Sequence, residues 1–147
     1  MKKQDGKSII IWIIGIIILT FIAIFAFDFF EKELNIKKQE DIKTEMLQVQ
    51  AKSKIILERY HVDNNNALKG EKVEDTSLEE KFGIDNIQNY YKWTKDVLIE
   101  VGLNNIILED NEYYLINYDL EEVIYSNGYK TEDGNIFYKL SDIKEQN

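Results

Sequence analysis

The stretch IIIWIIGIIILTFIAIFAF, residues 9–27, decides how this chain is organised. It holds 19 residues without a charge, and as a helix it would be roughly 28 Å long at about 1.5 Å per residue. That length matches the ~30 Å hydrocarbon core of a bilayer, where a helix satisfies its own backbone hydrogen bonds. A chain of 147 residues allows one further compact domain, too small to surround an apolar helix of this length. The stretch therefore predicts one membrane-spanning helix. Its marker residues are Ile9, Trp12, Gly15, Leu19 and Phe27.

The same stretch differs from a cleaved signal peptide. It is longer than the usual apolar region of such peptides, and no A-x-A-like cleavage site follows it. Instead, the chain continues with the large and charged residues Asp28-Phe29-Phe30-Glu31. We therefore expect an uncleaved signal anchor.

Lysines flank the predicted span on both sides, and their density is higher before it. Lys2, Lys3 and Lys7 precede the span, and positive residues favour the cytoplasmic side. We expect a cell-membrane protein that crosses once, with a cytoplasmic N-terminus and an extracytoplasmic C-terminal domain. The expected parts are a basic cytoplasmic tail (1–7), a transmembrane helix (8–30), an amphipathic helix that continues the anchor (31–60), and a small α+β domain (61–147).

The helical pattern continues beyond the span. The chain has no proline, and no glycine follows the span until Gly70. Apolar positions recur at steps of three and four around Ser53, as one face of a helix requires. They are Ile42, Met46, Val49, Ile56 and Tyr60. We expect one helix over residues 8–60, ending at the Asn-rich bend 61–66. Leu47, Ala51 and Ile55 are expected to widen this face on one side. The second half of the helix could form a coiled-coil seam, but the wide stripe favours packing on the chain's own C-terminal domain.

After Gly102 the apolar period changes from that of a helix to that of a strand. Before this point, 77–83 and 94–102 predict short helices, with Thr94 as an N-cap, and 85–93 is expected to be helical too. Strands are predicted over Asn105–Leu108, Glu112–Tyr118, Glu122–Ser126 and Asn135–Leu140. Short links indicate an antiparallel meander, whose apolar face must be covered. The predicted fold class is α+β, a long N-terminal helix, transmembrane in its first half, packed on a four-stranded antiparallel β-meander.

Composition excludes several kinds of chemistry. The chain has no cysteine, which removes disulfides, thiol catalysis and cysteine-ligated zinc, and its one histidine cannot form a histidine cluster. Residues 1–30 carry a net charge of +1 and residues 31–147 a net charge of −10, so the domain repels phosphate backbones. We expect no nucleic-acid partner, no cofactor, no catalytic residue and no enzyme activity. His61 is interpreted as a solvated residue at a helix end.

Calcium is the metal that the acidic loops of the chain could bind. Calcium takes several oxygen ligands in flexible geometry. The candidate loops are 109–112, the turn with Asp119, Glu121 and Glu122, and 132–135. Acidic turns are more often simply solvated, so no metal site is assigned.

The layout resembles type IV pilins and the pseudopilins of type II secretion. The elements that carry the resemblance are a short basic leader ending in Gly6, the apolar run, the amphipathic half-helix, and the strand-turn-strand stretch from Gly102 to Tyr125. The resemblance implies a helix packed on a small sheet and a structural role in an envelope assembly. Pilin precursors are cut after such a glycine and carry a glutamate at the fifth mature position. Here Lys7 follows Gly6 and Ile11 takes the glutamate position, which implies a minor or unprocessed component, or an unrelated chain that has converged on the same layout.

The leading hypothesis is a bacterial, membrane-anchored pilin-like or pseudopilin-like structural subunit. Its partners would be membrane lipid and other membrane-anchored subunits, in a homo- or hetero-oligomer. The alternative is a single-pass binding or sensor module with an extracytoplasmic α+β domain.

Overall fold

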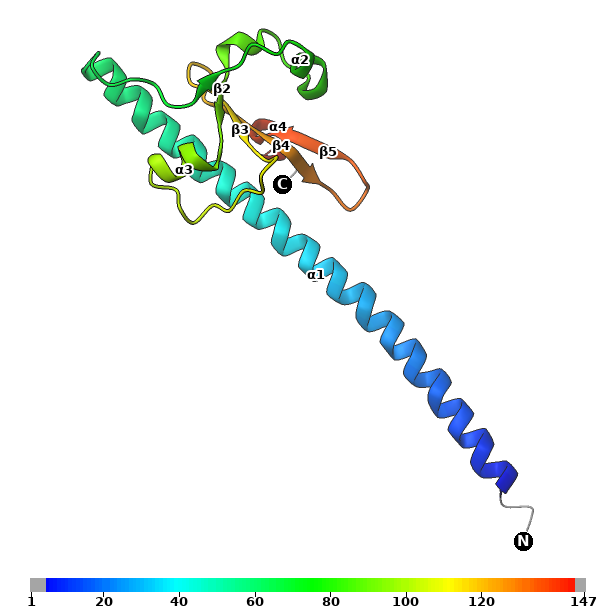
Figure 1. The fold of residues 1–147 in the computed structure, drawn as a ribbon. Helices are drawn as coiled ribbons and strands as arrows, with labels where there is room; N and C mark the ends of the chain where they lie inside the picture. Colours follow the sequence, from blue (N-terminus) through cyan, green and yellow to red (C-terminus); the bar gives the residue numbers. More distant parts are fainter. Residues whose placement is uncertain (1–4, 145–147) are drawn as a thin grey trace. The chain divides into compact units, whose positions relative to one another are not determined.

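The computed structural model describes residues 5–144, with side chains at 8–27 and 38–143. It divides into an N-terminal unit, Met1–Lys38, and a second unit, Gln39–Asn147, which we call the head. Helix α1, Asp5–Val62, contributes to both units (Figure 1). The predicted basic tail lies partly outside the described residues, because Lys2 and Lys3 belong to the undescribed terminus.

Helix α1 ends where the sequence indicates. The backbone amide of Asp63 still donates to the Arg59 carbonyl at 3.0 Å, which makes the last helical bond. The Asp63 side chain then accepts from the Asn65 amide at 3.0 Å, and the Asn66 side chain donates back to the Arg59 carbonyl at 3.3 Å. Short polar side chains that bond nearby backbone groups compete with a further helical turn.

The head contains an antiparallel sheet of five strands in the order β1-β2-β3-β4-β5, so the predicted number of four was wrong. The α+β class and the antiparallel neighbours are confirmed. The strands are β1 (Glu71–Lys72), β2 (Tyr91–Trp93), β3 (Tyr114–Asn117), β4 (Glu122–Lys130) and β5 (Ile136–Lys139).

The predicted strand Asn105–Leu108 is a loop in the structure. Its apolar alternation is real, because Ile106 and Leu108 are buried whereas Ile107 is 80% exposed. The two buried side chains enter the core without a neighbouring strand to pair with the backbone. The two-residue apolar period of this segment therefore reflects alternating side-chain burial and not the hydrogen bonding of a paired strand.

The predicted helix over residues 85–93 was also wrong. Asn86 has a positive φ of 63°, which a right-handed helix excludes, and only the 3₁₀ turn η1, Ile87–Asn89, follows it. Tyr91–Trp93 then forms β2, beside β3. Aromatic side chains favour strands, and this segment has β1 and β3 as pairing partners.

Short helices flank the sheet. Helix α2 (Ser77–Phe82) ends at Gly83, as predicted. Helix α3 (Lys95–Glu100) follows Thr94, which occupies the predicted N-cap position but makes no capping hydrogen bond with its side chain. At the end of α3, the Gly102 amide donates to the Ile99 carbonyl at 3.0 Å and the Leu103 amide to the Leu98 carbonyl at 2.8 Å. These two bonds and a φ of +85° at Gly102 define a Schellman cap. Helix α4 (Leu140–Lys144) was not predicted.

Apolar cores lie on both faces of the sheet. All four residues of β3 are buried, and alternate ones join different cores. Tyr114 and Ile116 pack with Met46 and Val49 of α1 in the first core, while Leu115 packs in the second. The second core also contains Val73, Phe82, Ile84, Ile87, Tyr90 and Ile124. The segment from β1 through η1 therefore covers the face that α1 leaves open.

Candidate functional site

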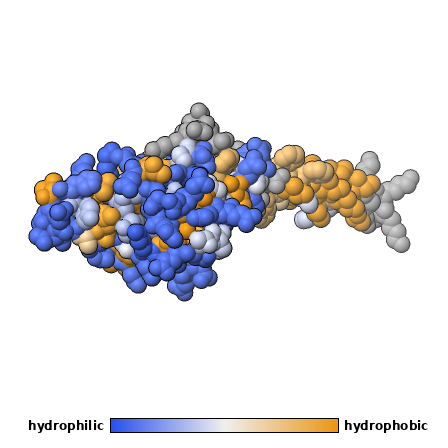
Figure 2. Space-filling view, turned by 90° about the horizontal axis from the view of Figure 1, so that it is seen from above, coloured by the Kyte–Doolittle hydropathy of each residue, from blue (hydrophilic) through white to orange (hydrophobic). Residues whose placement is uncertain are grey.

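The N-terminal unit provides the candidate membrane anchor. Residues Ser8–Phe27 form a helical segment with a mean hydropathy of 3.1, and none of it is buried in protein. Of the predicted marker residues, Ile9, Trp12, Leu19 and Phe27 are 58–75% exposed, and no atom lies within 4 Å of a Cβ placed on Gly15. Figure 2 shows this segment as apolar surface and the surface of the head as mainly hydrophilic. Among the described helices, one is long and apolar enough to cross a membrane.

The predicted packing face of α1 lies mostly in the first core. Met46 and Val49 are fully buried, Ile56 is 9% exposed, and Ile42 is partly buried against the same cluster. Tyr60 is 36% exposed, near the end of the helix, where its ring lies beside that of His61. Ser53, between the apolar positions, is buried and donates to the Gln50 carbonyl at 2.8 Å.

Polar side chains on the margins of this face join α1 to the sheet and its loops. Gln50 donates to the Glu121 carbonyl at 2.7 Å, and Lys54 pairs with the Glu121 carboxylate at 3.1 Å. Gln48 accepts from the Asn105 side chain at 2.8 Å. Gln39 accepts from the Tyr129 hydroxyl at 3.2 Å. The sequence places these residues on the polar side of the helix but does not identify their distant partners.

A carboxylate–tyrosine cluster also lies between α1 and the sheet. Tyr114 and Tyr125 are cross-strand partners on β3 and β4, with ring centroids 5.3 Å apart. The Tyr114 hydroxyl donates to Glu45 of α1 at 3.3 Å, and the Tyr125 hydroxyl donates to Glu112 at 3.0 Å. Glu112 also accepts from the Asn127 side chain at 2.6 Å and from the Glu109 amide at 3.0 Å.

The environment of this cluster disfavours negative charge. Burial raises the pKa of Glu45 above its ordinary value, and the charges of Asp41 and Glu112 add to that rise, although the bond from Tyr114 opposes it. Burial, and the carboxylates beside them, also raise the pKa of the Tyr114 and Tyr125 phenols. Both tyrosines therefore act as neutral donors at physiological pH.

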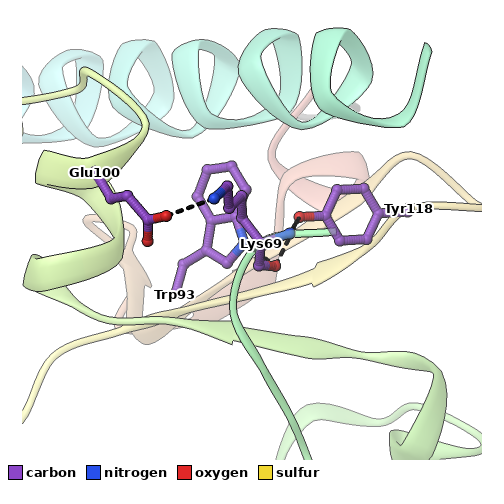
Figure 3. Close-up of polar contacts among 4 residues, drawn as sticks. All are labelled: Lys69, Trp93, Glu100 and Tyr118. Carbon is purple, nitrogen blue, oxygen red and sulfur yellow. Dashed lines mark hydrogen bonds and ion pairs between the residues drawn. The ribbon is translucent and has the colours of Figure 1, made fainter. Parts of the chain in front are cut away.

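The connection between α1 and β1 is fixed at Lys69, in an arrangement that we call the Lys69 latch (Figure 3). The Lys69 carbonyl accepts from the Trp93 indole at 2.9 Å and from the Tyr118 hydroxyl at 2.7 Å, while the Lys69 amide donates to the same hydroxyl at 3.0 Å. The Lys69 ammonium pairs with Glu100 of α3. At the next residue, a Cβ on Gly70 would lie 2.6 Å from Trp93, so glycine permits the close approach.

In two of the acidic loops, a carboxylate has a partner within the chain. Glu112 closes the 109–112 turn by accepting from the Glu109 amide, and Glu121 pairs with Lys54. In the turn between β4 and β5, the Thr131 amide donates to the Asn135 carbonyl at 2.9 Å. Over the described residues, no group of three or more acidic or histidine side chains has an arrangement that could hold a metal ion.

A hollow of about 560 Å³ lies between the start of α3 and the 109–113 loop. Its lining mixes both charges: Lys92 and Lys95 face a rim that includes Asp96, Glu109 and Glu112. The Lys92 ammonium lies 4.4 Å from the centre of the Tyr113 ring, a cation–π contact. Chemically, such a surface suits a polar solute with both charges better than an apolar one.

Sequence reasoning missed the second core and the Lys69 latch. Gly70 and Trp93 are visible in the sequence as single residues, but nothing in it shows that they come together. The bond from Trp93 to Lys69 joins residues that are 24 positions apart. Comparison of the chain with family models, with curated proteins and with solved structures gives no match.

Proposed function

We propose that this chain is a membrane-anchored structural subunit of an envelope assembly, pilin-like or pseudopilin-like, of the type IV pilus or type II secretion kind. In this proposal it works by association with lipid and with other anchored subunits, and it catalyses no reaction. The observation that carries the proposal is the exposed apolar segment Ser8–Phe27, attached to an α+β head built on the continuation of the same helix. Lipid is the solvent that such a segment requires.

A second apolar stripe supports association through α1. Leu47, Ala51, Ile55 and Val62 are exposed, Val62 by 88%, and their spacing places them along one side of the helix. The prediction that Leu47, Ala51 and Ile55 widen the buried face was wrong, because the helix places them on the side away from Met46, Val49 and Ile56. Ile55 and Val62 also line a hollow of about 340 Å³ with Glu58, Arg59 and Asn66. In the assembly that we propose, another anchored subunit would cover this stripe.

Cysteine cross-linking tests this proposal cleanly, because the chain has no cysteine of its own. Ala51→Cys and Ile55→Cys, each as a single variant of the full-length protein in native membranes, are expected to form disulfide-linked products on mild oxidation. Lys95→Cys is the matched control, since Lys95 is exposed on the head and outside the stripe. Cross-links at the stripe alone support the proposal, whereas monomers at every position would overturn it.

The mixed-charge hollow beside α3 favours a second candidate, a single-pass binding or sensor module with an extracytoplasmic head. Gene neighbourhood separates the two. An adjacent assembly ATPase, polytopic platform protein or prepilin peptidase favours the filament subunit. A neighbouring kinase, protease or transporter favours the sensor.

A further inference from the structure

Glu45 is a carboxylate placed between α1 and the sheet without a compensating cation. The ion pairs of the described residues are Lys54–Glu121 and Lys69–Glu100, and Glu45 is in neither. Its hydrogen-bond donor is the neutral phenol of Tyr114, which is fully buried. A charge that is partly withdrawn from water without a partner of opposite sign costs free energy.

The charged groups around Glu45 make this cost larger. On its own helix, Asp41 lies one turn earlier and raises the energy of the charged form. From the loop that precedes β3, Glu112 acts in the same direction. The facing strands β3 and β4 contribute Tyr114 and Tyr125, and the hydroxyl of Tyr125 is already bonded to Glu112. Thus one stacked tyrosine pair supplies donors to two carboxylates.

We propose that Glu45 is a proton-operated clasp: as the surrounding pH falls, Glu45 takes up a proton from water and α1 is held more tightly against the sheet. The bond to Tyr114 survives protonation, because a carboxylic acid can accept from a phenol or donate to it. Repulsion from Asp41 and Glu112 is lost. The inference depends only on the head and not on the assembly proposed above.

The direction of the effect follows from proton linkage. Burial above all, and then Asp41 and Glu112, raise the pKa of Glu45 above its ordinary value of 4.5 in the folded head. The folded protein therefore holds a proton in a pH range where the unfolded chain has released it. The stabilisation is fully present below pH 4.5 and is lost as the pH rises through the pKa of the folded state.

Carbon-13 NMR of the glutamate carboxyl groups tests the clasp directly, with full-length protein in detergent micelles. The Glu45 signal is expected to titrate above 4.5, the ordinary value for a glutamate carboxyl. Glu112→Gln removes one repelling charge and is expected to shift the Glu45 midpoint downward. A Glu45 midpoint at or below 4.5 in the wild type would overturn the proposal, and that measurement needs no variant to fold.

Amide hydrogen exchange tests the consequence for α1. As the pH is lowered from 7.5 to 4.5, protection factors over residues 42–57 are expected to rise in the wild type. Glu45→Gln carries no charge to lose and is expected to show the higher protection at both pH values. Glu58→Gln changes net charge equally and is expected to follow the wild type. If Glu45→Gln keeps the wild-type pH dependence, α1 is not held by this clasp.

Discussion

At the scale of the residue, one oxygen atom holds the connection that follows α1. The Tyr118 hydroxyl donates to the Lys69 carbonyl and accepts from the Lys69 amide. Burial raises the pKa of Tyr118 to about 12, although its bonds to Trp93 and Lys69 oppose the rise, so the hydroxyl keeps its proton across the physiological range.

Tyr118→Phe removes that hydroxyl and leaves the part-buried Lys69 amide without its acceptor. An unsatisfied group of this kind costs about 1–3 kcal/mol, and we expect the free energy of unfolding to fall by about 1–2 kcal/mol. Urea denaturation followed by tryptophan fluorescence measures the loss, since Trp93 bonds the same carbonyl. Tyr113→Phe is the control, because the Tyr113 hydroxyl makes no hydrogen bond within the described residues. Equal stability of the two variants would mean that the Tyr118 hydroxyl does not stabilise the Lys69 latch.

Burial could be predicted from the sequence for residues that recur at regular spacing on one face of a single element. Met46, Val49 and Ile56 are buried because a helix places them on one side, and spacing alone reveals that. The partner of Tyr118 could not be predicted in this way, because Lys69 lies 49 positions away and bonds through its backbone. Backbone acceptors are the same in every residue and leave no signature in the sequence.

At the scale of the element, the β4–β5 hairpin depends on a glycine. The pairing register between these strands shifts between Ile124 and Tyr129, and Gly128 in this interval has a φ of +71°. A Cβ at Gly128 would lie 2.5 Å from Ile136 and 3.0 Å from the Tyr138 ring on β5. The irregularity therefore requires a residue that has no side chain and tolerates positive φ.

Gly128→Ala is expected to lower the free energy of unfolding by about 3 kcal/mol, from the backbone strain and the clash with β5 together. Gly134→Ala separates the two causes. Gly134 has a similar φ of +83°, but nothing lies within 4 Å of its Cβ position, so only the strain of about 1 kcal/mol is expected. Thermal unfolding of both variants measures the difference. Similar losses would mean that β5 moves aside and the close approach has no cost.

Helices could be predicted from the sequence where residues close by in the chain cap their ends. Gly83 and Gly102 cap α2 and α3 through bonds within a few residues, and both helices appear where those glycines predict. Asn105–Leu108 and β2 were mispredicted because strand pairing depends on a neighbour from elsewhere in the chain. Tyr91 of β2 finds Ile116 of β3 opposite it, whereas the 105–108 segment finds no strand.

At the scale of the whole molecule, the two units differ in whether protein covers their apolar residues. The head covers both faces of its sheet with its own chain, so the side chains of its two cores are withdrawn from water. The segment Ser8–Phe27 has no protein over it. Since exposing so many isoleucine and phenylalanine side chains to water is unfavourable, the segment requires another apolar environment. Length and hydropathy can be read from the sequence, so a helix long and apolar enough to cross a membrane could be predicted and the second core could not.

Two lysines near the middle of the segment test whether lipid is that environment. The Ile, Leu and Phe residues of the span together favour insertion by on the order of 6 kcal/mol, and each central lysine opposes it by about 3 kcal/mol. Ile17→Lys combined with Ile18→Lys should therefore nearly cancel the driving force. We expect the wild type to stay with membranes after alkaline carbonate extraction and most of the double variant to be released. Ile107→Lys combined with Leu120→Lys is the control, because both positions are exposed on the head and this variant should remain with the membranes. If the wild type is itself released, or stays monomeric in water without detergent, the segment does not span a bilayer and the proposed assembly subunit loses its anchor.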